Sequence, residues 1–430
     1  MGLMLDIAYL TGLTVSSPFW GYKLLSTGKW RTDWNGRFGK GEALPKPPGS
    51  KTILFHAVSV GETNLIRRLV AELESRDENL NIVIANTTNT GINTSNKLYG
   101  EKHSVVRYPL DLSGAVAHFL DRVKPDVVAT VELEVWPHLT EACHKRGIPI
   151  CVINGRISDR SFPRYAKFAP LLKPTFRKLS AAAMQTQTYA DRIMAMGTPL
   201  NRVHVLDSMK WDAADLSDTV PGVDELATAM GIDRNRPVVV LGSTGDDEEK
   251  LLTDQLERVL ADEVQIIIVP RKPERFDAVA NQYPKIIRRS ENPDGHARPL
   301  DDQRYFLVDT LGELRKVYCL GNVVIVGRSF NRWGGSDPIE PVALGKPVIY
   351  GPDHRNFTEI ANALHDGGGI IIPKDPTQAA IDTARLLANT EEASTLAANG
   401  REVIRSRLGA TQRHADLLMS LLHQSKAIHT

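Results

Sequence analysis

The segment 327–357 constrains the fold more than any other part of the chain, because in it a glycine-rich loop joins a strand to a helix and a second strand. An apolar run typical of a buried strand comes directly before it. Gly334 and Gly335 let the backbone take a positive φ angle or approach a ligand closely. Pro338 suits a first helical turn, and the run 347–350 gives the second strand. This order predicts a βαβ crossover whose helix N-terminus faces a bound anion or sugar.

The alternative explanation is that these glycines and prolines only form turns and loops, and it fits any one of them taken singly. Their density within one segment favours a ligand site. Similar apolar runs predict further strands along the chain, over 52–58, 81–85, 127–131, 148–153, 203–206, 238–241, 265–269, 306–308, 323–326 and 370–372.

Composition limits the chain to globular architectures. Its 430 residues, 42% apolar and 24% charged, suffice for two or three domains, of which two is the natural number. The 52 basic and 51 acidic side chains nearly cancel, so the overall charge gives no reason to expect nucleic acid as a partner. Cys143, Cys151 and Cys319 lack the spacing of a metal site and cannot all pair, which fits a reducing compartment.

The N-terminus carries an uncharged run, residues 7–22, followed by a basic flank. The run is shorter than the roughly 20 apolar residues needed to span hydrocarbon, and it contains Pro18. Aromatic residues gather where the run meets the flank, namely Phe19, Trp20 and Tyr22. This arrangement predicts a membrane-associated segment over residues 1–27 that lies in the lipid interface. The alternatives are a buried helix and a signal peptide, but a signal peptide should begin with basic residues and here Asp6 leads.

Glu62 follows the first predicted strand, after the turn Ser59-Val60-Gly61, and begins a helix expected over 62–76. In the first helical turn the positive end of the helix dipole favours an ionised carboxylate. An acidic residue at this place is also a common helix stabiliser, and the spacing alone favours that structural explanation.

Two more carboxylates follow the strand predicted over 127–131. Glu132 and Glu134 occupy alternate positions, so strand alternation predicts that they point to opposite faces, one toward a cleft and the other solvated or paired. A salt-bridged structural glutamate is the competing explanation for Glu132. Lys210 follows the last strand of this half, where a surface lysine is the ordinary expectation.

A stretch rich in Asp, Thr, Pro and Gly, 212–237, predicts a linker between two domains. The predicted organisation is a first domain over 28–211, a second over 238–409, and a last helix over 410–430.

Two places in the second domain carry candidate ligand groups. Pro270 and Arg271 leave the end of a predicted strand, where an arginine can fork onto a phosphate. Leu311, Gly312 and Glu313 open a helix, so the free amides near Gly312 can meet a phosphate and the Glu313 carboxylate can bind a hydroxyl. A capped helix is the structural alternative.

Motifs in matching order resemble the family of 3-deoxy-D-manno-octulosonic acid (Kdo) transferases, which act in lipid A biosynthesis. Its donor-site block is similar to Gly334-Gly335, Asp337-Pro338-Ile339-Glu340-Pro341, Gly345, Pro347, Gly351-Pro352 and Asn356-Phe357. Its acceptor-side motif resembles His56-Ala57-Val58-Ser59-Val60-Gly61-Glu62. The resemblance covers nearly all of the chain and implies an α/β, GT-B glycosyltransferase fold with two Rossmann-like doubly wound domains facing a cleft. In this fold the last helix, here over 410–430, crosses back to the first domain.

The resemblance also implies a reaction and roles for single residues. The reaction is inverting transfer of Kdo from CMP-Kdo to the 6′-hydroxyl of a lipid A precursor, lipid IVA, with Glu62 as general base. Glu132 corresponds to a glutamate that supports the transition state, and Lys210 to the lysine of the G-S-x-K-F-D segment that assists it. The residues implied to bind the CMP part of the donor are Pro270, Arg271, Leu311, Gly312, Glu313, Asp337, Pro338, Ile339 and Glu340.

The implied location is the cytoplasmic face of the inner membrane, with no metal, cofactor or nucleic acid. The chain departs from the family at Gly245-Asp246-Asp247, where His-Glu-Gly is more usual, so no donor contact is carried over to those positions. A GT-B epimerase or a uridine-donor transferase would share the architecture but not the motif 56–62. A membrane-attached sensor would bind CMP-Kdo without turnover.

Overall fold

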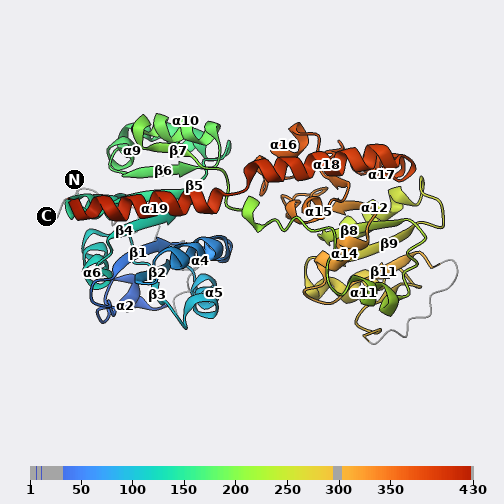
Figure 1. The fold of residues 1–430 in the computed structure, drawn as a ribbon, viewed down its shortest axis with the longest axis horizontal. Helices are drawn as coiled ribbons and strands as arrows, with labels where there is room; N and C mark the ends of the chain where they lie inside the picture. The colour runs from blue at the N-terminus through green and yellow to red at the C-terminus, as the bar shows by residue number, and fades with distance from the viewer. Residues whose placement is uncertain (1–5, 7–10, 12–31, 294–302, 428–430) are drawn as a thin grey trace. The chain divides into compact units, whose positions relative to one another are not determined.

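The computed structural model describes residues 6, 11, 32–293 and 303–427. The chain forms two compact units (Figure 1). One comprises Met1–Lys210 together with Gly409–Thr430, and the other comprises Trp211–Leu408. The C-terminal segment therefore belongs to the first unit although it follows the second in the chain.

The first unit is built on a parallel sheet of seven strands in the order β3-β2-β1-β4-β5-β6-β7. Its strands are β1 (Lys51–His56), β2 (Leu80–Asn86), β3 (Ser104–Arg107), β4 (Val127–Val131), β5 (Ile150–Gly155), β6 (Ala181–Met184) and β7 (Val203–Val205). The strand order reverses between β1 and β4, which pair directly. The carboxyl ends of β1 and β4 therefore flank the topological switch point, where ligands bind in open sheets of this kind.

Helices cover both faces of this sheet, because alternate residues of each strand enter different cores. In β1, Leu54 belongs to one buried cluster while Ile53 and Phe55 belong to the other. C-terminal helix α19 packs against α4 and β4, and its Leu418 is fully buried (Figure 1). The described helices are α2 (Trp34–Arg37), α3 (Val60–Leu65), α4 (Arg67–Arg76), α5 (Asn89–Tyr99), α6 (Ser113–Val123), α7 (Pro137–Lys145), α8 (Phe162–Lys167), α9 (Ala169–Phe176), α10 (Gln187–Met196), η1 (Leu200–Arg202) and α19 (Ala410–Ala427).

The second unit contains a six-stranded parallel sheet in the order β10-β11-β9-β8-β12-β13. Its strands are β8 (Val238–Thr244), β9 (Gln265–Pro270), β10 (Ile287–Arg288), β11 (Tyr305–Leu307), β12 (Val323–Val326) and β13 (Val348–Tyr350). Its helices are η2 (Trp211–Ala213), α11 (Val223–Met230), α12 (Glu248–Leu256), η3 (Pro273–Arg275), α13 (Phe276–Ala280), α14 (Leu314–Leu320), α15 (Ile339–Ala343), α16 (Thr358–Asp366), α17 (Pro376–Ala388) and α18 (Thr390–Arg407). Here the order reverses between β8 and β12, so the glycine-rich loop after β12 begins at the switch point.

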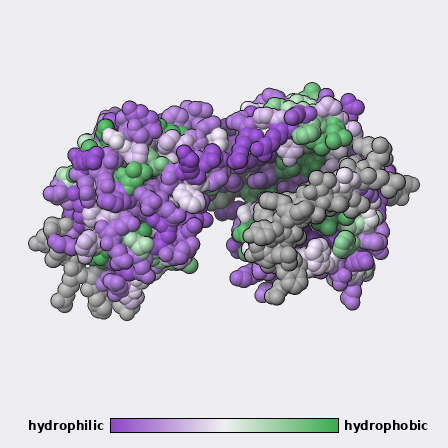
Figure 2. Space-filling model, turned by 180° about the vertical axis from the view of Figure 1, so that it is seen from behind, coloured by the Kyte–Doolittle hydropathy of each residue, from purple (hydrophilic) through white to green (hydrophobic). Residues whose placement is uncertain are grey.

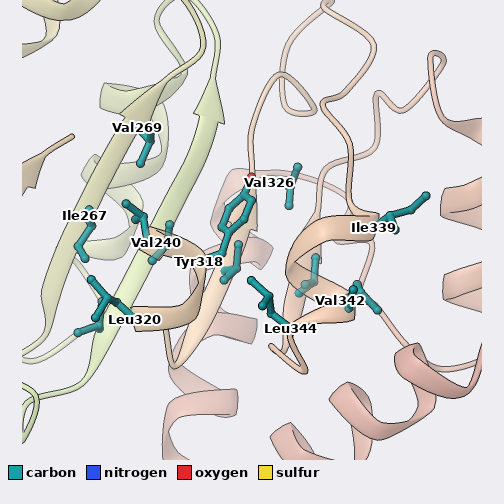
Figure 3. Packing of buried hydrophobic residues seen from close by; sticks show 14 of the residues in the cluster. Val240, Ile267, Val269, Tyr318, Leu320, Val326, Ile339, Val342 and Leu344 are labelled. Carbon is teal, nitrogen blue, oxygen red and sulfur yellow. The ribbon is translucent and has the colours of Figure 1, made fainter. Parts of the chain in front are cut away.

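One core cluster of the second unit fixes two helices that begin at the carboxyl edge of the sheet. Tyr318 and Leu320 of α14, and Ile339 and Val342 of α15, pack with the apolar residues of β8, β9 and β12 (Figure 3). Tyr318 is 1% exposed and Ile339 is 2% exposed. Burying apolar side chains of this size contributes about 1.5–3 kcal/mol each, so both helices are held against the sheet.

The segment expected to be a linker, 212–237, belongs to the second unit instead. It contains α11, whose Leu226 and Met230 lie in the main core. Gly222 and Gly231, both in the left-handed region, bound this helix at its two ends. Its 8 residues make about two turns, which is too few for an apolar period to stand out among turn-forming residues.

Two other expectations differ locally from the structure. The helix expected over 62–76 is broken at Ile66 into α3 and α4. The strand expected over 370–372 is reduced to one bridge between Ile371 and Ile349.

The surface in Figure 2 is mainly hydrophilic, with apolar side chains in separate patches. No helix within the described residues is long and apolar enough to cross a bilayer. The membrane-associated segment expected over 1–27 lies outside the described residues, apart from Asp6 and Thr11. The Asp6 carboxylate accepts the backbone N–H of Ser113 at 3.0 Å and so caps the start of α6.

Candidate active site

Glu62 lies at the carboxyl end of β1, in the first turn of α3. Its Oε2 accepts the Val58 N–H at 2.7 Å, and its Oε1 accepts the Ser59 hydroxyl at 2.8 Å. Ser59 is the N-cap of α3 and accepts the Glu62 N–H in return at 3.4 Å. The carboxylate therefore supports the turn as a capping group, and each oxygen keeps a lone pair for a further partner.

Burial controls the ionisation of Glu62. It raises the pKa of this half-buried carboxyl group to about 7, and the nearby charges of Glu132 and Glu134 add to the effect, while the Val58 and Ser59 hydrogen bonds oppose it. The expectation that the helix dipole keeps the carboxylate ionised was therefore wrong. Removing the charge from water costs more free energy than the helix start returns. A carboxylate with a pKa near neutrality is suited to accept a proton in catalysis.

Glu132 and Glu134 do not follow the alternation expected of them. Strand β4 ends at Val131, and Glu132 has a φ angle of 59°, in the left-handed region, so the two-residue period stops there. Both charges act on Glu62, which places the three carboxylates together at the end of β1 and β4. The Glu134 carboxylate accepts the indole N–H of Trp136 at 2.7 Å.

The structure does not support the explanation that Glu132 is a salt-bridged structural residue. Neither Glu132 nor Glu62 forms an ion pair with any residue of the described part of the chain. The group of Glu62, Glu132 and Glu134 is here called the carboxylate cluster, and none of its three carboxylates forms an ion pair within the described chain. Within the described ranges, no group of three or more His, Cys, Asp or Glu side chains is arranged to hold a metal ion.

Lys210 is the last residue of the first unit before the chain enters the second. Its loop is tied to the end of β5, since the Met209 N–H donates to Asn154 Oδ1 at 2.9 Å. The Lys210 N–H lies 3.4 Å from the Ser208 hydroxyl, and the residue is half-buried. The backbone that carries Lys210 is therefore fixed by the first unit.

Arg271 directly follows β9 in the second unit, and its N–H donates to the Thr244 carbonyl at 3.0 Å. Its guanidinium is exposed and makes no hydrogen bond or ion pair with a described residue. The Tyr318 hydroxyl interacts electrostatically with Arg271, Asp337 and Glu340, so these side chains gather at the carboxyl edge of the sheet. We call Arg271, Asp337 and Glu340 the Arg271 cluster.

The predicted residues 337–340 divide into two kinds. Asp337 is exposed, and its Oδ1 accepts the Ile339 N–H at 2.9 Å. Glu340 is half-buried; burial raises its pKa, and Arg315 opposes the rise. Pro338 and Ile339 are buried, and Ile339 is part of the core, so these two shape the helix start without offering a side chain to a ligand.

The residues expected to open the helix before the glycine-rich loop, 311–313, also differ in what they can offer a ligand. Leu311 is 77% exposed, and Gly312 has a φ angle of 87°, which favours glycine. Glu313 is the residue before α14, and its carboxylate already pairs with Arg289 at 3.1 Å and with Lys316 at 3.5 Å. A ligand hydroxyl would therefore share Glu313 with two cations.

The glycine-rich loop has the geometry that its sequence predicted. Gly334 and Gly335 have φ angles of 81° and 83°, and a Cβ atom at Gly335 would overlap the Tyr350 hydroxyl. Both conformation and packing therefore require glycine at this position.

Glu248 is a structural residue that sequence analysis missed. It is fully buried, and its Oε1 accepts the N–H groups of Ser329 and Phe330, both at 2.9 Å. Its Oε2 accepts the Gly245 N–H at 2.8 Å and that of Arg328. One carboxylate thus joins the loop after β8 to the loop after β12. The only sequence signal was a pair of consecutive glutamates, Glu248 and Glu249, which three residues separate from an apolar strand.

Comparison with solved structures identifies the class. HepE of Anabaena, in a complex with UDP, superposes with a TM-score of 0.58 at 14% identity, covering 86% of this chain and 100% of that one. MurG of Acinetobacter baumannii gives a TM-score of 0.55 at 14% identity, covering 86% and 99%. The two Rossmann-like, doubly wound units have the GT-B fold, as predicted.

Sequence comparison then identifies the family. Residues 32–213 match the family model of 3-deoxy-D-manno-octulosonic-acid transferase (kdotransferase). The 3-deoxy-D-manno-octulosonic acid transferase of Haemophilus influenzae is 31% identical over 392 residues, which are 89% of each chain. The protein of the same name from Bordetella pertussis is 31% identical over 404 residues, 91% of this chain and 92% of that one. The chain belongs to the Kdo transferase family, which confirms the resemblance seen in its motifs.

Proposed function

We propose that this protein transfers Kdo from CMP-Kdo to the 6′-hydroxyl of a lipid A precursor, lipid IVA, with inversion at the anomeric carbon. The observation that carries the proposal is Glu62, a half-buried carboxyl group whose pKa of about 7 suits a general base, within the motif 56–62. Membership of the Kdo transferase family supports the choice of donor and acceptor.

In the proposed reaction the acceptor hydroxyl oxygen bonds to the anomeric carbon of Kdo while the bond from that carbon to the CMP phosphate breaks. Glu62 takes the hydroxyl proton, and CMP leaves with the electron pair of the broken bond. Kdo has no hydroxyl beside its anomeric carbon, so the transition state resembles an oxocarbenium ion and the leaving group needs little acid catalysis. The remaining tasks of the protein are to orient the acceptor and to stabilise charge.

Groups of the second unit stabilise the negative charge on the departing phosphate. The Arg271 guanidinium has no partner in the described chain and can fork onto phosphate oxygens, and the amides near Gly312 provide further donors. Asp337 and Glu340 can accept hydroxyl groups of the sugar or ribose. In the first unit, Glu132 stabilises the positive anomeric carbon, and Lys210 assists the transition state.

The proposed place of this reaction is the cytoplasmic face of the inner membrane, where residues 1–27 would hold the protein in the lipid interface. This placement rests on the uncharged run and its basic flank in the sequence.

The test is to incubate the protein with CMP-Kdo and a tetraacylated lipid A precursor in detergent and to weigh the glycolipid product by mass spectrometry. We expect the acceptor to gain one or more Kdo residues and CMP to be released in equal number. A parallel reaction with UDP-N-acetylglucosamine should give no product. An unchanged acceptor, with CMP-Kdo bound but not consumed, would refute catalysis and favour a sensor.

A further inference from the structure

Two arginines of the first unit converge on one carbonyl oxygen. Arg37, the last residue of α2, donates to the Thr87 carbonyl at 2.7 Å, and Arg107, the last residue of β3, donates to it at 3.0 Å. Arg107 is only 8% exposed. Two cations that share one acceptor repel each other, so this arrangement needs negative charge nearby.

The protein supplies little of that charge. Burial lowers the pKa of Arg37 and of Arg107, the charge of Arg107 adds to the effect at Arg37, and Asp33 opposes it at both. Asp33 also caps α2, where its Oδ1 accepts the Gly36 N–H at 2.9 Å. One capping carboxylate thus faces two guanidinium groups, which leaves an excess of one positive charge.

Several N–H groups around the pair have no acceptor within the described chain. They are Nε of buried Arg107, the Nε and Nη1 groups of Arg37, and the backbone N–H groups of Asn89 and Thr90. The last two belong to the first turn of α5, an 11-residue helix whose dipole also favours an anion. Arg107 joins the helix to the pair, because its Nη2 donates to Asn89 Oδ1 at 2.6 Å.

This group of donors adjoins the loop that holds Glu62. The Thr88 hydroxyl donates to the Val58 carbonyl at 3.0 Å, and the Val58 N–H donates to Glu62 Oε2 at 2.7 Å. Strands β1, β2 and β3 are parallel neighbours, so the loops after them meet at the same edge of the sheet. An anion bound by the arginines would therefore lie one loop away from the carboxylate cluster.

We propose that Arg37, Arg107 and the first turn of α5 bind a phosphomonoester on the sugar headgroup of the glycolipid acceptor. The nature of the acceptor rests on the proposed function, whereas the site rests on the contacts of these residues. A phosphate dianion offers enough oxygens for the unfilled donors and offsets the repulsion between the guanidinium groups. A purely structural role, in which the arginines only clamp Thr87, is the competing explanation.

The test compares a phosphorylated acceptor with the same glycolipid after phosphatase treatment. The measured quantity is the ratio of kcat/KM for the two acceptors, because general damage to the Glu62 loop cancels in the ratio. We expect Arg37→Gln to lower this phosphate preference about tenfold or more, which is typical of losing a charge-assisted hydrogen bond. Lys97→Gln, which removes an exposed cation from the last turn of α5, should keep the wild-type ratio. A ratio that Arg37→Gln leaves unchanged would overturn the proposal.

Equilibrium binding separates this inference from the proposed function. If wild-type protein transfers no Kdo, the proposed function fails, and binding of the two glycolipids in detergent micelles, followed by thermophoresis of labelled protein, still tests the site. We expect wild-type protein to bind the phosphorylated form more tightly and Arg37→Gln to lose most of that difference. Equal binding of both forms by wild-type protein would overturn the site. Loss of the difference in micromolar inorganic phosphate would assign the site to free phosphate and overturn the glycolipid assignment.

Discussion

Replacement of Glu62 by glutamine tests the proposed base with little change of shape. A glutamine can keep both contacts of the carboxylate, because its oxygen can accept the Val58 N–H and its amide can donate to the Ser59 hydroxyl. It cannot accept a proton from the acceptor. Loss of a general base typically lowers turnover about 10²- to 10⁴-fold, and we expect Glu62→Gln to fall in this range while CMP affinity stays near wild type.

The pKa of Glu62 gives the same prediction a pH signature. With a pKa of about 7 the ionised fraction rises from about one tenth at pH 6 to about nine tenths at pH 8. Wild-type kcat/KM should therefore rise about tenfold over this interval. An exposed glutamate, with a pKa of roughly 4.3, would give no such rise. The residual activity of Glu62→Gln should lack this step.

Thermal unfolding separates catalysis from capping. Because folding raises the pKa of Glu62 from 4.5 to about 7, ionisation of this group opposes folding; the cost begins as the pH exceeds 4.5 and is complete above about 7. It is on the order of 3 kcal/mol. Glu62→Gln avoids this cost, so it should melt no lower than wild type at pH 8. Near-normal transfer by the variant would refute the mechanism, and melting many degrees lower would show that Glu62 acts mainly as a helix cap.

Three more changes test the other parts of the molecule. Arg271→Ala should weaken CMP binding about tenfold to a hundredfold in calorimetry, and Arg271→Lys should not restore it, because lysine lacks the planar fork; unchanged affinity would remove Arg271 from the site. Glu248→Ala should lower the free energy of unfolding by about 3 kcal/mol or more in denaturant titrations, since four backbone N–H groups lose their acceptor; a loss below about 1 kcal/mol would contradict this. Removing residues 1–27 should shift the protein to the soluble fraction and keep turnover in detergent, at a cost of about 1 kcal/mol for the Asp6 cap; failure to fold would contradict an anchor.

Strands that are rich in β-branched apolar residues could be predicted. Strands β4 and β12 have the predicted bounds, 127–131 and 323–326, as expected of parallel strands buried on both faces. Strand β6 was missed because Ala181–Met184 has no β-branched or aromatic residue, and β10 because it has 2 residues. These strands form through their neighbours in the sheet, which a local pattern does not contain.

The site was predictable where it depended on chain order and not where it depended on packing. The motif around Glu62 and its place after β1 followed from the sequence. Its raised pKa did not, because burial and the charges of Glu132 and Glu134 come from the fold. Glu248 was not predicted for a similar reason, because it binds the backbone of residues 328–330, about 80 positions away in the chain.

The departure from the family pattern at residues 245–247 has a physical account. Asp247 has a φ angle of 63°, a conformation that the glycine more usual in the family adopts without strain and that aspartate tolerates better than most residues. Asp246 forms an ion pair with Arg275, with 2.7 Å between Oδ1 and Nε. The contacts that hold the loops come from the two residues that follow, because Glu248 binds four backbone N–H groups and Glu249 pairs with Arg275 at 2.6 Å. The residues that hold the loops of the second unit therefore follow the positions that depart from the family pattern. The changed residues alter the loop surface, and they lower the stability at most by the strain of one aspartate in the left-handed conformation.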